Sequence, residues 1–134
     1  MAADTILTKF RDLSKLTDSQ FSDTDMTDKA EPYAIETYND IMDTDYTITS
    51  HTTGSDRVNE AVAYICAEFA FRRLFFKRAW SEKNTADEYM QSALRLMNYV
   101  DPSKVAYDEH SGRFYPRYDK RGKPCFTIRF SEND

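Results

Sequence analysis

Apolar residues recur at helical spacing in four stretches of the chain, and one stretch is apolar on almost every side. Residues 61–71 (AVAYICAEFAF) contain a single charged residue, Glu68, and lie inside a helix expected from Ser55 to about Trp80. A surface helix keeps a polar face toward water, so a helix of this kind must be covered on several sides. The pattern therefore predicts a mainly α fold, a small helical bundle around a long central apolar helix.

Shorter helices with one apolar face each are expected to cover the central helix. The first spans residues 4–16, and the last follows a cap at Asn84 and stops before Pro102, because the residue before a proline disfavours helix. Their apolar stripes fall at spacings of three and four residues. The stripes comprise Ile6, Phe10 and Leu13 in the first helix, Ala34, Tyr38 and Ile41 in the second, and Ala86, Met90, Ala93, Met97 and Val100 in the last.

The second helix is expected to begin near residues 27–28. Glu31 is placed to complete a capping box there, and Pro32 is tolerated in a first turn because backbone N–H groups at that point lack helical acceptors. The next segment, residues 43–55, is rich in Thr, Ser and Asp. This composition is typical of an exposed loop, with a short extended piece at residues 46–49.

The pattern changes to that of β-strands after the last helix. Residues 104–107 and 113–115 flank the turn sequence His-Ser-Gly at 110–112, which is typical of a hairpin. The final run CFTIRF (125–130) alternates apolar and polar side chains. It is expected to be a strand that buries one face in its own subunit or in a neighbour.

These patterns divide the chain into a helical core, residues 1–101, and a C-terminal strand-rich arm for assembly contacts, residues 102–134. Residues 1–45 carry eleven acidic and four basic residues, whereas residues 113–129 carry six basic residues against Asp119 alone, in a chain of net charge −5. Complementary charges steer and orient association between identical subunits packed head to tail or in a ring. Solvated charge without a partner is the alternative that the sequence leaves open.

Residue types that usually carry catalysis or bind metals are scattered. His51 and His110 sit in turn-rich segments with no nucleophile or metal-ligand motif beside them, so solvated loop histidines are expected. Glu68 is expected to pair with Arg72 one helical turn later, or with an arginine from another helix. The run DTDMTD (23–28) lacks the glycine and the twelfth-position Glu of a calcium loop, which favours a helix-capping role. We therefore expect no enzymatic activity, cofactor or metal site.

Composition bears on three further properties: phosphate binding, the redox state of the cysteines and membrane association. Its three glycines are not closely spaced, which argues against a phosphate-binding loop. Cys66 and Cys125 lie far apart, and Cys66 is expected to be a small buried apolar residue in a reduced, intracellular protein. No apolar run approaches the about 18–20 residues that a membrane span needs, and the N-terminus has no secretory signal pattern, so no membrane association is expected.

Aromatic and basic residues exceed the needs of one small core. The chain holds nine Phe, nine Tyr and one Trp, and subunit interfaces are enriched in aromatic residues and arginine. Basic residues also gather at the C-terminal end of the central helix. Their structural interpretation is that they stabilise the negative end of the helix dipole. The candidate interface residues are Arg72, Arg73, Lys77, Arg78, Trp80, Arg113, Phe114, Tyr115, Arg117, Tyr118, Phe126, Ile128 and Phe130.

Three passages carry a family resemblance: LSKLTDSQ (13–20), AIETYNDIMDTDYTI (34–48), and VNEAVAYICAEFAFRRLFFKR (58–78) leading into TADEYMQSALRLMNYVD (85–101). Together they resemble the head–tail connector, or adaptor, proteins of tailed bacteriophages, in pattern and length. The resemblance implies a small α-helical, non-enzymatic subunit of the virion neck, assembled in the host cytoplasm. Such subunits form a ring, usually dodecameric, below the portal protein. The ring extends the DNA channel and receives head-closure (stopper) or tail-completion proteins.

By this resemblance, the loop at 44–55 and the arm at 102–134 are assembly segments, and DNA passes through the lumen without specific binding. The alternative is a small helical nucleic-acid-binding or regulatory module. It would use the four basic residues Arg72, Arg73, Lys77 and Arg78 together with residues 113–129. The net charge of −5 weighs against that alternative, because phosphate contacts dominate nucleic-acid affinity.

Overall fold

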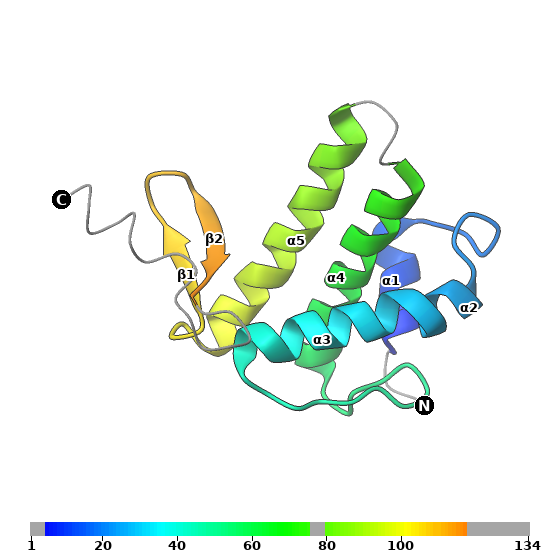
Figure 1. The fold of residues 1–134 in the computed structure, drawn as a ribbon, viewed down its shortest axis with the longest axis horizontal. Helices are drawn as coiled ribbons and strands as arrows, with labels where there is room; N and C mark the ends of the chain where they lie inside the picture. The colour runs from blue at the N-terminus through cyan, green and yellow to red at the C-terminus, as the bar shows by residue number, and fades with distance from the viewer. Residues whose placement is uncertain (1–4, 76–79, 118–134) are drawn as a thin grey trace.

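The fold is a helical bundle with one small β-hairpin at its side (Figure 1). A computed structural model describes residues 5–75 and 80–117, with residues 74–75 and 80–84 described by their backbone alone. In chain order the elements are α1 (Ile6–Ser14), α2 (Asp23–Asp25), the π-helical turn η1 (Met26–Ala30), α3 (Glu31–Met42), α4 (Asp56–Phe75), α5 (Trp80–Val100), β1 (Val105–Asp108) and β2 (Arg113–Pro116). The mainly α architecture predicted from the sequence is confirmed.

Helix α4 is the centre of the bundle, and α1, α3 and α5 all pack against it. Alanines on several sides of α4 let these neighbours approach closely. The buried residues of α4 are Val58, Asn59, Ala61, Val62, Ala63, Ile65, Cys66, Ala67, Glu68 and Ala70. The central apolar helix is thus confirmed, although it ends at Phe75 and Trp80 begins the next helix. Among the described residues, no helix, α4 included, combines the length and apolarity needed to cross a membrane.

One helical stretch runs from Asp23 to Met42, so the prediction of a start near residues 27–28 was wrong. Ser22 caps this stretch, because its hydroxyl oxygen accepts the Asp25 N–H at 3.0 Å. The wider turn η1 lies directly before Pro32. Proline has no N–H to donate and crowds the carbonyl four residues earlier in an ordinary α-helix, so the helix widens there. Residues 28–31 therefore continue a helix and form no capping box.

Helix α5 starts at Trp80, before the cap expected at Asn84. Its packing against α4 outweighs the local capping signal, as tertiary contacts often do. Ala86, Ala93 and Met97 are buried as predicted, but Val100 is 46% exposed and Leu94, at 4%, takes its place in the buried stripe. Val100 is the last residue of α5, and its side chain is not enclosed by the core.

Strands β1 and β2 form the antiparallel hairpin that the sequence predicts, with Tyr107 opposite Phe114. Asp108 holds the turn together, since its carboxylate accepts the His110 N–H and the Ser111 hydroxyl, each at 3.0 Å. Gly112 has a φ of 71°, a backbone conformation that glycine adopts without steric cost. The strand predicted at residues 125–130 lies outside the described residues.

Candidate functional site

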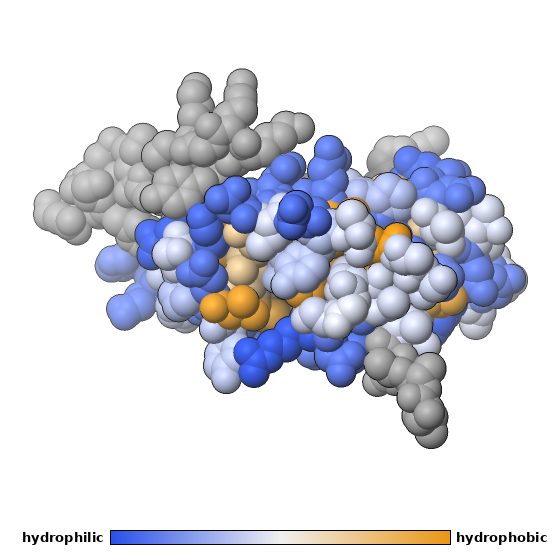
Figure 2. All heavy atoms as spheres, turned by 90° about the horizontal axis from the view of Figure 1, so that it is seen from below, coloured by the Kyte–Doolittle hydropathy of each residue, from blue (hydrophilic) through white to orange (hydrophobic). Residues whose placement is uncertain are grey.

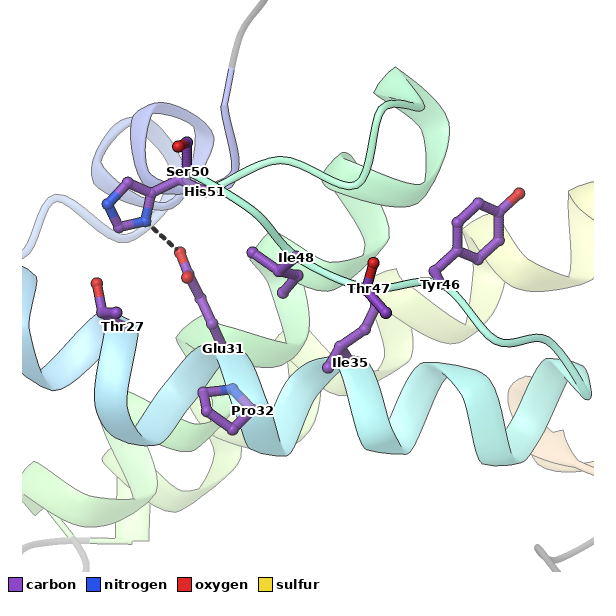
Figure 3. Close-up of a pocket in the computed structure, with 9 residues that line it drawn as sticks. All are labelled: Thr27, Glu31, Pro32, Ile35, Tyr46, Thr47, Ile48, Ser50 and His51. Atoms are coloured by element: carbon purple, nitrogen blue, oxygen red, sulfur yellow. Dashed lines mark hydrogen bonds and ion pairs between the residues drawn. The ribbon is translucent and has the colours of Figure 1, made fainter.

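A groove of about 310 Å³ lies between α3 and the loop at residues 43–55 (Figure 3). The loop crosses beside the helix, and apolar side chains from both elements face the space between them. The Glu31–His51 pair closes one end, and Tyr46 stands at the other. We call this feature the α3–loop groove, lined by Thr27, Glu31, Pro32, Ile35, Tyr46, Thr47, Ile48, Ser50 and His51.

His51 and Glu31 form a close pair at the end of the groove. The imidazole Nδ1 and Glu31 Oε2 share a hydrogen bond of 2.6 Å, and Glu31 is only 3% exposed. Burial raises the pKa of the Glu31 carboxyl, and the hydrogen bond and charge of His51 oppose that shift. The prediction that His51 is a solvated loop histidine was wrong, because residues 43–55 fold back along α3. His110 remains an exposed turn residue, as expected.

The turn that carries His51 has an unusual backbone. Thr49 and Thr52 exchange two backbone hydrogen bonds, of 3.0 and 3.2 Å, around the two-residue turn Ser50-His51. Both turn residues have positive φ, 53° and 66°, where residues other than glycine are uncommon. The His51 carbonyl accepts the Ile6 N–H at 2.7 Å, which ties the turn to the first residue of α1. The expected extended piece at residues 46–49 is reduced to this single bridge.

Two asparagines hold the rest of the loop in place. The side chain of Asn39 bonds both backbone groups of Tyr46, its Oδ1 accepting the N–H at 3.0 Å and its Nδ2 donating to the carbonyl at 2.9 Å. Asn59 of α4, which is 1% exposed, accepts the Thr53 N–H at 2.8 Å. The loop is therefore fixed to two helices, and the groove beside it is a defined surface.

Acidic residues dominate the surroundings of the groove. Residues 30–56 contain six carboxylates and no Lys or Arg: Glu31, Glu36, Asp40, Asp43, Asp45 and Asp56. In the described part of the chain, one of these forms an ion pair with a lysine or arginine, namely Asp43 with Lys104 at 3.8 Å. Such a cluster gives the surface a negative potential that attracts cationic groups.

The basic end of α4 serves the fold itself. Arg72 pairs with Glu68, which is 1% exposed, and its Nη2 lies 3.4 Å from Asp87 Oδ1 of α5. The predicted pairing of Glu68 is thus confirmed. Arg73 lies over the ring of Phe69, with 5.3 Å from the guanidinium carbon to the ring centroid. The other interface candidates in this region, Lys77, Arg78 and the side chain of Trp80, lie outside the described residues.

The hairpin is fastened to α5. Gln91 bonds both backbone groups of Phe114, accepting its N–H at 2.8 Å and donating to its carbonyl at 2.9 Å. The rings of Tyr107 and Phe114 are in contact at a tilt of 50°, with centroids 4.8 Å apart. The hairpin places Arg113, Phe114, Tyr115 and Arg117 on the far side of α5 from α4, so they do not meet Arg72 and Arg73 (Figure 1). Tyr118, Phe126, Ile128 and Phe130 lie outside the described residues.

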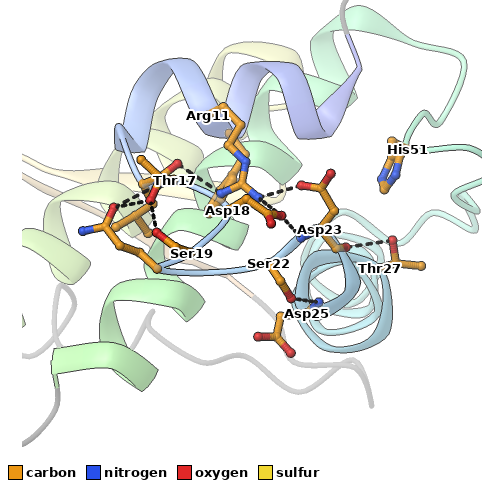
Figure 4. Close-up of polar contacts among 12 residues, drawn as sticks. Arg11, Thr17, Asp18, Ser19, Ser22, Asp23, Asp25, Thr27 and His51 are labelled. Carbon is orange, nitrogen blue, oxygen red and sulfur yellow. Dashed lines mark hydrogen bonds and ion pairs between the residues drawn. The ribbon is translucent and has the colours of Figure 1, made fainter.

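Contacts within the protein already engage the acidic run at residues 23–28 (Figure 4). Arg11 of α1 donates to Asp23 Oδ1 at 2.7 Å, and the Asp23 N–H donates to Asp18 Oδ1 at 3.0 Å. Asp25 lies 3.5 Å from the Lys29 ammonium group. Over the described residues, no group of three or more His, Cys, Asp or Glu side chains is arranged to hold a metal ion. These carboxylates lie in the first turns of a helix and bind the protein's own cations, whereas the capping role predicted for them is carried out by Ser22.

No family model, curated protein or solved structure matches this chain. The sequence did not predict the α3–loop groove, because the Thr-rich composition of residues 43–55 is typical of an exposed loop. Two signals mark it in retrospect. One is the absence of any Lys or Arg from 30 to 56, and the other is Ile48, an aliphatic side chain within a mainly polar segment.

Proposed function

We propose that this chain is the ring subunit of a bacteriophage neck, a structural virion protein that lies below the portal, joins capsid to tail and extends the DNA channel. Its partners in this proposal are identical copies of itself in a ring, usually dodecameric in this family, the portal protein above and a head-closure or tail-completion protein below. DNA passes through the lumen without specific binding.

The observation that carries the proposal is the position of the hairpin relative to α2. These elements lie at opposite ends of the long axis of the molecule (Figure 1). A subunit in a ring contacts its two neighbours through different surfaces, and such head-to-tail contacts close into a ring when the rotation between subunits allows it. A rigidly attached hairpin at one end and a folded acidic helix–loop face elsewhere supply two different surfaces.

The attachment of the hairpin supports an assembly role as well. Gln91 and Asn98 of α5 bond β2 and β1, the second through the Val105 carbonyl at 2.7 Å. Tyr107 is 48% exposed and Tyr99, in the last turn of α5, is 73% exposed. Exposed tyrosines held on fixed elements are common anchors of protein–protein interfaces.

A truncation tests the assembly role of the arm. Removing residues 118–134 leaves the hairpin intact, including Val105, which is fully buried in the core. We expect the truncated chain to keep its circular dichroism spectrum and thermal transition but to lose co-sedimentation with portal rings. Unchanged co-sedimentation would show that residues 118–134 are not needed for assembly.

The alternative, a nucleic-acid-binding module, rests on Arg73, which is exposed beside Phe69. A labelled single-stranded oligonucleotide discriminates the two functions. The ring subunit is expected to bind it weakly at every salt concentration. A nucleic-acid-binding module would lose affinity steeply between about 50 and 200 mM salt, as counterion release requires.

A further inference from the structure

The α3–loop groove has an apolar interior and is built from an acidic stretch of the chain. Pro32, Ile35 and Ile48 line its middle, and Tyr46, which is 37% exposed, stands at one end. The face of the molecule that carries the loop is mainly hydrophilic, with apolar side chains showing in separate places (Figure 2). A groove of this kind accommodates one aromatic or aliphatic side chain of a partner.

Two exposed carboxylates that adjoin lining residues of the groove in sequence favour a cationic partner. Glu36 follows Ile35 in α3, Asp45 precedes Tyr46 in the loop, and both are exposed. Neither forms an ion pair within the described part of the chain. Negative charge at these positions repels phosphate groups and attracts Lys and Arg, so a nucleic acid is disfavoured here and a basic peptide is favoured.

The chain itself contains a segment with the matching chemistry. Residues 118–129 (YDKRGKPCFTIR) hold four basic residues against Asp119, together with the aromatic residues Tyr118 and Phe126. The described structure ends at residue 117, beside α5, and 17 further residues follow it, 118–134. An extended chain of that length reaches up to about 60 Å, whereas a compact chain of this size has a radius of gyration of about 14 Å. The segment is therefore long enough to reach a neighbouring molecule.

We propose that the α3–loop groove is the docking site for residues 118–129, the basic segment that follows the hairpin, of a second copy of this chain. An aromatic side chain of the arm enters the groove, and the flanking Lys and Arg residues lie against Glu36, Asp45 and their neighbours. The contact is head to tail, because the groove of one copy receives the arm of the next. This inference deepens the proposed function and rests on it for the ring arrangement.

Reciprocal charge reversals in the full-length chain test the docking. The groove variant carries Glu36→Lys and Asp45→Lys, and the arm variant carries Lys120→Glu, Arg121→Glu and Lys123→Glu. We expect each variant alone to associate at least tenfold more weakly than the wild type in sedimentation velocity at low salt. A mixture of the two is expected to recover association, because each groove then meets an arm of opposite charge. A control with Asp12→Lys and Glu88→Lys makes the same charge change at exposed positions outside the groove and is expected to associate like the wild type.

Each other outcome overturns the docking. Variants that associate like the wild type show that the groove and the arm do not meet. Single variants that weaken without recovery in the mixture show that the groove and the arm both take part in association but do not contact each other. A wild-type chain that stays monomeric up to about 1 mM excludes docking of a second copy in the free protein. If rings still form on the portal in any of these cases, only the docking fails and the proposed function stands. If no rings form on the portal, the proposed function itself is contradicted.

Discussion

The imidazole Nδ1 of His51 lies 2.6 Å from Oε2 of Glu31, and this contact joins the loop after α3 to the first turn of that helix. His51 occupies a strained position in a two-residue turn, with a φ of 66°. Its carbonyl also accepts the Ile6 N–H. One residue therefore links α1, α3 and the loop, and the shape of the α3–loop groove depends on it. Strained residues persist where surrounding contacts determine their conformation, as these do.

His51→Ala is expected to loosen the groove and lower the free energy of unfolding by about 1–3 kcal/mol, because it leaves the buried Glu31 carboxylate without its partner. Hydrogen exchange at the Ile6 amide should accelerate together with exchange in residues 49–52. His110→Ala, in the exposed hairpin turn, is the matched control and is expected to change stability by less than about 0.5 kcal/mol. Equal effects of the two substitutions would contradict the link between the loop and the helices.

Stability should depend on pH through Glu31. Burial raises the pKa of this carboxyl, so the folded state binds its proton more tightly than the unfolded state does. The stabilisation is complete at pH values below the ordinary pKa and declines as pH rises through the raised value. His51 and the thiol of Cys66 are the other titratable groups beside it. The Glu31→Gln variant does not titrate there, so in urea unfolding it should gain stability relative to the wild type as pH rises above the ordinary glutamate pKa of about 4.3. A difference that stays constant or moves the other way contradicts this account.

Gln91→Leu should detach the hairpin from α5. The substitution keeps helix propensity but removes both hydrogen bonds to the Phe114 backbone, at a cost of about 1–3 kcal/mol. Amide exchange at Phe114 should accelerate while exchange in α4 stays slow. Glu88→Gln, one turn earlier and beside the same hairpin, is the control and should leave Phe114 protected. Simultaneous loss of protection in α4 would show that the hairpin and bundle form one cooperative unit.

Arg72→Met and Arg73→Met should separate structural from surface roles at the end of α4. Arg72 partners the buried Glu68, so its loss is expected to cost about 1–3 kcal/mol, with the half-exposed position of Arg72 keeping the effect moderate. Arg73 contacts the ring of Phe69 from the surface, so its loss is expected to cost less than about 1 kcal/mol. Thermal unfolding at constant pH measures both. A larger effect at Arg73 would reverse the roles assigned to the two residues.

Sequence periodicity predicts the covered central helix well, because burial on all sides requires an apolar run and the run is visible in residues 61–71. It also predicts the hairpin, whose turn contains Gly112 between two strand-like segments. Helix starts were less predictable. Residues 23–26 join the second helix because Ser22 caps it and η1 accommodates Pro32, and α5 begins at Trp80 because α4 lies beside it.

The candidate site was harder to predict than the fold because it depends on contacts between distant residues. The pairing of Glu68 with Arg72 is local, at one helical turn, and the sequence predicts it. The contacts of His51 with Glu31 and Ile6 join residues far apart in the chain, and no local pattern encodes them. The loop that forms one wall of the groove is held by Asn39 and Asn59, whose side chains imitate backbone hydrogen bonding at points that composition does not mark.

The ring assembly is the central claim, and the mass and shape of the purified chain mixed with portal rings of a tailed bacteriophage test it most directly. Light scattering gives the mass, and negative-stain imaging gives the shape. We predict a ring of this chain with an open centre, stacked on one face of the portal. A monomer that ignores the portal and shifts labelled DNA at low salt would contradict the claim and favour a nucleic-acid-binding module.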